Sequence, residues 1–383
     1  MIAGGRHVKN CGIRNADRGV TGGERSPARA GDWQRAPAHG ILCTIVLVAS
    51  RALAGGVAWS EDFSTDPIAA GRFSIPAGHD ASRFTYHPAA HSLTVHYDTF
   101  EPTAWYVRPI DPTNTRTLTG CDDFEFAVNF RIRSAGFFAD PNSFAQIGWG
   151  LINSASTGPD RAGGSAGPYA FDCVTLDYFP NVSPLYGGPT LGAAVVHSDE
   201  GRGFFSAIDF PFGAESEVKA ANGDEQILLD TTYTGHVRYS SATQTATLTI
   251  QSAGGLLNIN VDGGGGPGGA DADPTTIQTT LFYPEPFAVD QFALTAWQDT
   301  FNPFGSSVIA DVDISAVTFF APGILKGDMN RDGLVDGRDI ALFVQTLLAA
   351  QPDPCLVGRG DFNGDANATT ADISGFQEAL LGP

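Results

Sequence analysis

The sequence predicts a mainly β protein, in which an antiparallel β-sandwich of the jelly-roll type precedes a small α-helical module. Glycine accounts for 46 of the 383 residues and phenylalanine for 26, whereas methionine occurs twice and lysine three times. This composition is typical of strands and turns and argues against long helices. Short runs of alternating polarity fill the middle of the chain, and the final stretch carries a repeat with helical periodicity.

The strands are predicted between residues 59 and 321. The clearest run is 123–133, whose one face carries only Phe124, Phe126, Val128, Phe130 and Ile132. Period-two alternation of this kind indicates a strand with one buried face. Eight further runs are expected to be strands: 92–97, 145–153, 170–179, 191–197, 235–239, 246–251, 291–297 and 307–320. Residues 239–243 are predicted to form a hairpin turn, and the glycine-rich run 263–274 a flexible loop.

An N-terminal extension and signal peptide are predicted over residues 1–54. The uncharged apolar run 40–49 follows an arginine-rich stretch, and Ala52 and Ala54 have the small-residue spacing of a signal-peptidase site. We expect cleavage after Ala54 and a secreted or cell-surface protein. A run of ten apolar residues is about half of what spans a bilayer, so a retained anchor is the weaker interpretation.

The charge balance excludes one class of partner. The chain carries a net charge of −20, and the part after residue 54 carries −25, because it holds 14 basic and 39 acidic residues. An acidic surface repels nucleic acids and anionic lipid headgroups. We therefore expect no nucleic-acid binding. No second long apolar run follows residue 54, so no membrane span is expected in the mature chain.

Three cysteines remain after residue 54, namely Cys121, Cys173 and Cys355. Outside the cell one disulfide is expected, and Cys121–Cys173 is the favoured pair because both lie in or beside strands of one domain. Cys355 would then be a free thiol or pair between chains. Three unpaired thiols are the alternative.

The only internal repeat found lies in the last domain, predicted over residues 322–383, after a sandwich domain over 55–321. Asp328, Asn330, Asp332 and Asp339 recur 33 positions later as Asp361, Asn363, Asp365 and Asp372. After each set, apolar residues follow at i, i+3, i+7 and i+8, the spacing of one helix face: Ile340, Phe343, Leu347 and Leu348, then Ile373, Phe376, Leu380 and Leu381. Each repeat is therefore predicted to be a loop followed by a helix.

Oxygen ligands at positions 1, 3, 5, 7, 9 and 12 of a twelve-residue loop are the pattern that binds calcium. Two ions are predicted, held by Asp328, Asn330, Asp332, the Leu334 carbonyl, Asp336 and Asp339, and by Asp361, Asn363, Asp365, the Asn367 carbonyl, Thr369 and Asp372. Position 6, a sharp turn, is Gly333 in the first loop and Ala366 in the second. Asp336 adds a charge where Thr369 is neutral, so the carboxylate count predicts tighter binding at the first loop.

A half EF-hand duplicated in this way resembles the type I dockerin module, over roughly residues 327–381. The resemblance implies calcium-dependent folding and docking onto a cohesin-like domain in a secreted or surface assembly. In that family partner choice centres on loop positions 10 and 11, which are Gly337-Arg338 and Thr370-Ala371 here. These pairs differ from each other and from the hydroxyl-rich pairs of cellulosomal members.

The larger domain resembles the concanavalin A-like lectin/glucanase sandwiches of the laminin G kind. The resemblance rests on Glu61-Asp62-Phe63, the hairpin 235–250 and the closing strands 291–297 and 309–319. It implies a carbohydrate ligand or substrate. The E-x-D-x-x-E sequence of laminarinase-like members is absent.

Candidate catalytic residues are few. Asp123 and Glu125 share one strand face but are weak candidates, and His79, His87, His91 and His96 do not have the parity of a shared zinc site.

Sugar-stacking candidates are Trp105, Tyr106, Tyr178, Tyr186 and Trp297, each of which has core packing as its alternative. The sequence thus favours a secreted non-catalytic recognition or structural subunit. A secreted polysaccharide-degrading glycoside hydrolase with a divergent site is the alternative.

Overall fold

The computed structural model describes residues 56–113, 116–137, 147–158, 172–179, 190–196, 227–257, 275–280, 287–297 and 308–382. The predicted signal segment, its cleavage site, the loop 263–274 and Tyr186 lie outside these residues.

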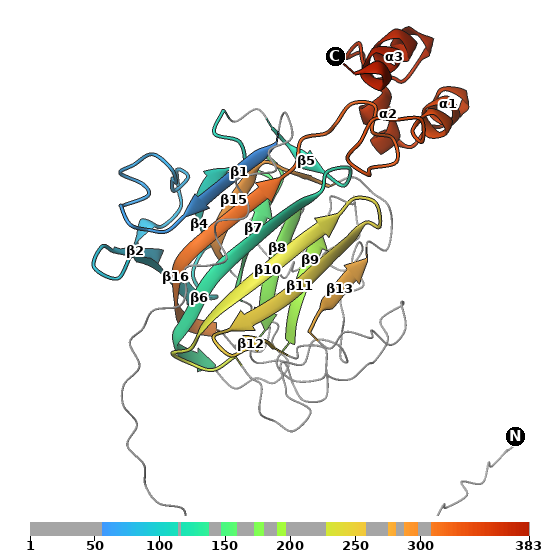
Figure 1. Ribbon diagram of the computed structural model, residues 1–383. Helices are drawn as coiled ribbons and strands as arrows, with labels where there is room; N and C mark the ends of the chain where they lie inside the picture. Colours follow the sequence, from blue (N-terminus) through green and yellow to red (C-terminus); the bar gives the residue numbers. More distant parts are fainter. Residues whose placement is uncertain are drawn as a thin grey trace, which may run out of the picture. The chain divides into compact units, whose positions relative to one another are not determined.

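A nine-stranded antiparallel sheet forms one layer (Figure 1). Its main path runs β12 (Gly255–Leu256), β11 (Thr245–Ser252), β10 (Thr232–Ser240), β6 (Phe124–Phe137), β16 (Val308–Ala321), β3 (Ser92–Asp98) and β2 (Phe84–His87). Two strands lie off this path: β1 (Val57–Glu61), which pairs with β16, and β13 (Ile277–Thr280), which pairs with β11. The first and last strands of the sandwich are therefore neighbours.

A five-stranded antiparallel sheet forms the second layer, in the order β4 (Ala104–Pro109), β15 (Gln291–Ala296), β7 (Ile147–Ile152), β8 (Cys173–Phe179) and β9 (Thr190–Val196). A two-stranded ribbon is formed by β5 (Leu118–Thr119) and β14 (Ala288–Val289). The predicted antiparallel sandwich is thus confirmed.

The core lies between the two sheets because the inner face of each is apolar. The five predicted inward residues of β6 are at most 2 % exposed. Phe126 meets Phe292 of β15 with ring centroids 5.8 Å apart, and Phe130 meets Trp149 of β7 at 4.8 Å. Aromatic side chains thus pack against one another across the two layers.

All nine predicted strand runs are found, with ends shifted by a few residues, and the hairpin joins β10 to β11 as expected. Seven further strands in the described part of the chain were not predicted, namely β1, β2, β4, β5, β12, β13 and β14. In β4 the first four residues are all buried, so the strand lacks the period-two signal.

Glu61, at the end of β1, forms a buried ionic cluster. Its side chain accepts two hydrogen bonds from Arg72, at 2.6 and 2.9 Å, and lies 3.8 Å from Arg108. The Arg108 guanidinium also lies 4.1 Å from the centre of the Trp59 ring. The acidic start of the sandwich is therefore a structural ion cluster that fixes β1.

The disulfide differs from the favoured prediction. Cys121, in the turn between β5 and β6, is bonded to Cys355, with a Cα–Cα distance of 4.9 Å. Cys173 is buried in β8 of the other sheet and forms no disulfide. Membership of the same predicted domain did not identify the pair, because a disulfide requires close Cα atoms, which only the tertiary fold brings about.

The C-terminal module has three α-helices: α1 (Ile340–Leu348), α2 (Pro354–Gly360) and α3 (Ile373–Leu381). Short 3-10 turns, η2 (Ala81–Arg83) and η4 (Thr370–Asp372), complete the helical elements of the described residues. Helices α1 and α3 begin immediately after the two loops, as predicted. None of the helices in the described part of the chain has the length and apolar character required to cross a bilayer.

Helix α2 was not predicted. Asp353 caps it by accepting a hydrogen bond from the Cys355 N–H at 2.8 Å, and Pro354 occupies its first turn. An Asp-Pro pair is a helix-start signal that the sequence contained. The second loop therefore has an entering helix of seven residues.

Candidate metal centre

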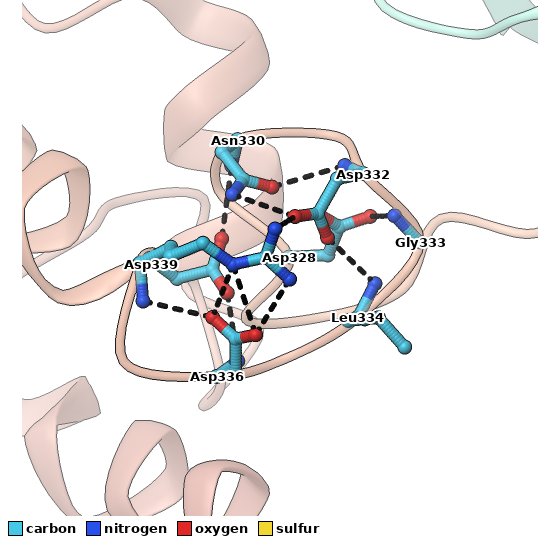
Figure 2. A network of polar contacts seen from close by, with 8 residues as sticks. Asp328, Asn330, Asp332, Gly333, Leu334, Asp336 and Asp339 are labelled. Atoms are coloured by element: carbon cyan, nitrogen blue, oxygen red, sulfur yellow. Dashed lines mark hydrogen bonds and ion pairs between the residues drawn. The ribbon is translucent and has the colours of Figure 1, made fainter.

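The first acidic loop, residues 328–339, is closed by two buried carboxylates (Figure 2). Asp328 accepts hydrogen bonds from the backbone N–H groups of Asp332 at 3.0 Å and Gly333 at 3.1 Å. Asp339 accepts from the N–H groups of Asn330 at 3.0 Å and Asp336 at 2.8 Å. The side chains at positions 1 and 12 thus hold both ends of the loop.

The second loop, residues 361–372, repeats these hydrogen bonds. Asp361 accepts from the N–H groups of Asp365 at 3.2 Å and Ala366 at 3.0 Å. Asp372 accepts from the N–H groups of Asn363 at 3.0 Å and Thr369 at 2.8 Å. The constant offset of 33 residues in the sequence is therefore a repeat of structure as well.

The loop carboxylates differ in their protonation equilibria. Burial raises the pKa of Asp328 above its usual value, although two N–H donors and Arg359 act against it. Burial also acts to raise the pKa of Asp372, but hydrogen bonds from three backbone N–H groups outweigh it, and the pKa is lowered. Hydrogen bonds from Arg338 lower the pKa of Asp336.

The donor set fits calcium. Asp328, Asp339, Asp361 and Asp372 are each at most 7 % exposed, and carboxylates removed from water require a cation or strong donors nearby. Every predicted ligand is an oxygen, which suits a hard divalent ion. No three His, Cys, Asp or Glu side chains of the described residues converge as a complete metal site, and the predicted sets also depend on amide, hydroxyl and carbonyl oxygens.

Two backbone positions in each loop adopt positive φ. Position 6 has φ +84° at Gly333 and +64° at Ala366, which agrees with the sharp turn expected there. Position 4 has φ +63° at Arg331 and +81° at Gly364. Each loop therefore has glycine at one of these positions and a strained residue at the other.

Replacing Ala366 by glycine should stabilise the module by about 0.5–1 kcal/mol, because only the side chain opposes the left-handed conformation. Denaturant unfolding of the full chain, followed by helix circular dichroism, measures this. Gly333→Ala is the matched control: no atom lies within 4 Å of an added Cβ, so φ alone should make it destabilising. Equal stability of Ala366→Gly and the parent chain would show that the backbone at Ala366 is not strained.

Basic side chains contact the loops in a way that the ligand pattern did not indicate. Arg359 donates to the Asp328 carbonyl at 3.1 Å, and Lys326, its counterpart 33 residues earlier, donates to the Asp361 carbonyl at 2.5 Å. Each loop thus receives a cation from the segment preceding the other loop. Arg338 contacts its own loop, at Asp332 and Asp336.

The apolar face predicted for helices α1 and α3 is only partly buried. Phe343 and Phe376 stack with ring centroids 4.0 Å apart and, with Met329, form the small core. The other predicted members include four exposed residues: Ile340, Leu348, Ile373 and Leu381. With Val344, which is 44 % exposed, Ile340 and Leu348 form an apolar stripe along α1 at i, i+4 and i+8.

The candidate acids of the sandwich, Asp123 and Glu125, both contact β10 or the turn that follows it. Glu125 lies 3.5 Å from His236, and hydrogen bonding to this imidazole lowers the pKa of Glu125. A glycosidase general acid requires a raised pKa. Asp123 accepts a hydrogen bond from the Ser241 N–H at 2.7 Å and so holds the β10–β11 turn.

The four clustered histidines have separate surroundings. His79 accepts a hydrogen bond from the Trp105 N–H, His87 contacts the Thr94 hydroxyl at 2.8 Å, and His96 contacts Asp311 at 2.8 Å. His91 has φ +49° in the turn before β3. Three of the four imidazoles therefore each contact a different partner.

The aromatic candidates for sugar stacking are buried. Trp105, Tyr106, Tyr178 and Trp297 are at most 8 % exposed, and Trp105 packs edge-to-face on Trp297 at 6.1 Å. The core alternative therefore holds for these four residues. Burial also raises the pKa of Tyr178 to about 12.

Comparisons with known proteins found one matching family model and a set of similar solved structures. Residues 326–381 match the family model of the dockerin type I domain. Among solved structures, peanut lectin in complex with a nine-residue peptide has 11 % identity, covering 70 % of this chain and 98 % of its own, with a TM-score of 0.39. Lectin I from Ulex europaeus, in complex with the methyl glycoside of α-L-fucose, has 14 % identity, 71 % and 100 % coverage and a TM-score of 0.38.

These TM-scores lie below 0.5, so the sandwich assignment rests on the strand topology described above. No curated protein is similar to the chain in sequence. The C-terminal repeats therefore match the dockerin type I domain, as the duplicated loops indicated, and domains of that family generally bind calcium and cohesin partners.

Proposed function

We propose that this chain is a secreted, non-catalytic recognition or structural subunit, in which a calcium-dependent docking module attaches a glycan-binding β-sandwich to a cohesin-like protein. The observation that carries the proposal is the duplicated loop network of 328–339 and 361–372, each followed directly by a helix. Calcium, when bound, would supply positive charge to the buried carboxylates of each loop.

The helix surfaces support docking. The stripe of Ile340, Val344 and Leu348 is exposed along α1, and α3 exposes Ile373 and Leu381 at the equivalent ends. Exposed apolar residues grouped on one helix face are typical of protein-binding surfaces. Gln377 replaces the central apolar residue on α3, so the two helices present different surfaces.

The non-catalytic interpretation is supported by Asp123 and Glu125, the strongest acid candidates in the sequence. Both carboxylates are occupied by structural hydrogen bonds, and the pKa of Glu125 is shifted away from that of a general acid. A two-sheet antiparallel sandwich is shared by lectins and glucanases, so a glycan ligand is compatible with either activity. The alternative is a polysaccharide-degrading glycoside hydrolase with a divergent site.

The sandwich should bind a glycan without cleaving it. A glycan-array screen of the full chain, followed by a reducing-sugar assay on each glycan that binds, tests this. Binding without release of reducing ends is expected. Release that disappears in Glu125→Gln or Asp123→Asn would establish the hydrolase alternative, whereas the matched surface variant Glu378→Gln on α3 should leave the assay unchanged.

A further inference from the structure

Arg338, at position 11 of the first loop, lies across two of the predicted calcium ligands. Its Nη1 is 2.8 Å from Oδ2 of Asp332, and its Nη2 is 2.7 Å from Oδ2 of Asp336. Its Nε adds contacts of 3.1 and 3.0 Å to the two oxygens of Asp336. Both carboxylates lie at the loop in Figure 2, and they are the ligands of positions 5 and 9.

Among the described residues, no cation contacts the carboxylates of the second loop in this way. Its position 11 is Ala371, and Asp365 at position 5 accepts the same hydrogen bond from the Asn363 amide, at 3.0 Å, that Asp332 receives from Asn330. Lys326 and Arg359 make equivalent crossed contacts with the first carbonyl of each loop, and Arg359 also lies 3.6 Å from Oδ2 of Asp328. Arg338 is the cation that contacts two predicted ligands of the first loop and has no counterpart at position 11 of the second.

We propose that Arg338 acts as a tethered cation that competes with calcium at the first loop, so that the second loop is the tighter site. This rests on the calcium-dependent function proposed above. It reverses the order expected from counting carboxylates, because Arg338 cancels the extra charge of Asp336 and must be displaced before Asp332 and Asp336 can bind the ion.

The size of the effect follows from the exposure of the pair. Arg338 is 60 % exposed, and exposed ion pairs contribute modestly when taken singly. We expect that freeing both carboxylates from Arg338 would raise the calcium affinity of the first loop roughly tenfold. Because the side chain reaches into water, its removal leaves the small core of Met329, Phe343 and Phe376 intact.

Calcium titration calorimetry of the full chain tests the proposal. Arg338→Gln should tighten the weaker binding event about tenfold and leave the tighter one unchanged. Arg331→Gln is the matched control, because it removes the same charge from the same loop, but this guanidinium donates to Ser241 at 3.1 Å. The control should change affinity about threefold or less, since only a screened long-range charge is lost.

Site assignment completes the test. Asp361→Ala should abolish the tighter event and Asp328→Ala the weaker one, and Ala371→Arg should weaken the second loop. Two results would overturn the role of Arg338 but leave the proposed calcium binding intact. One is loss of the tighter event in Asp328→Ala, and the other is equal calcium affinities in Arg338→Gln and the parent chain. Absence of both events in the parent chain would overturn the calcium-dependent function and this inference with it.

Discussion

Removing the disulfide between Cys121 and Cys355 should lower the free energy of unfolding by roughly 2–5 kcal/mol, the range found for native disulfides of small domains. The chain-entropy model gives about 5 kcal/mol for a loop of this length. The bond joins residues 234 positions apart, so it closes a long loop and strongly restricts the unfolded chain. The bond is also a second covalent link between the sandwich and helix α2, besides the peptide chain that continues after β16. Without the bond, only the peptide chain connects them.

Denaturant unfolding of the full chain measures this effect, with Cys121→Ala and Cys355→Ala combined so that neither partner of the bond is left as a new thiol. The parent chain in reductant should unfold at the same denaturant concentration as the double variant. Cys173→Ala is the control, since it keeps the disulfide and should lose stability in reductant as the parent chain does. Unchanged unfolding of the double variant would show that the bond does not constrain the unfolded state.

Removing calcium should unfold helices α1 and α3 while the sandwich keeps its strands. Each helix has nine residues, which is shorter than isolated helices need to be stable in water. The module core has three fully buried apolar residues, and each loop has two buried carboxylates that lose their cation. Binding to the folded state alone contributes about 2.7 kcal/mol per site at a hundred times the dissociation constant.

Far-ultraviolet circular dichroism of the full chain before and after chelation is the measurement. The helical signal should fall, return when calcium is restored, and not return with magnesium, which demands a stricter octahedral geometry. Near-ultraviolet signals of the sandwich aromatics should be unchanged and serve as the internal control. Helicity that is indifferent to chelator would show that the module folds without its metal.

Much of this architecture was predictable because it depends on local patterns. The alternation over 123–133 specifies a strand whose inward residues are buried, as they are in β6. The 33-residue repeat specifies the two loops and the helices after them, because ligand spacing and helix capping act within a few residues. The positive φ of Ala366 was likewise foreseeable from its alignment with Gly333.

Tertiary structure decided whatever depends on residues distant in the chain. Cys121 pairs with Cys355 because the fold brings their Cα atoms to 4.9 Å, and no local pattern encodes that distance. Leu348 and Leu381 share the helical period of Phe343 and Phe376 but remain exposed, because a core built from two short helices is too small to cover every apolar position. The contact of Arg338 with Asp332 and Asp336 depends on how the loop folds. The sequence therefore predicts the ligand set, whereas the structure determined which of its charges are paired with a cation of the chain itself.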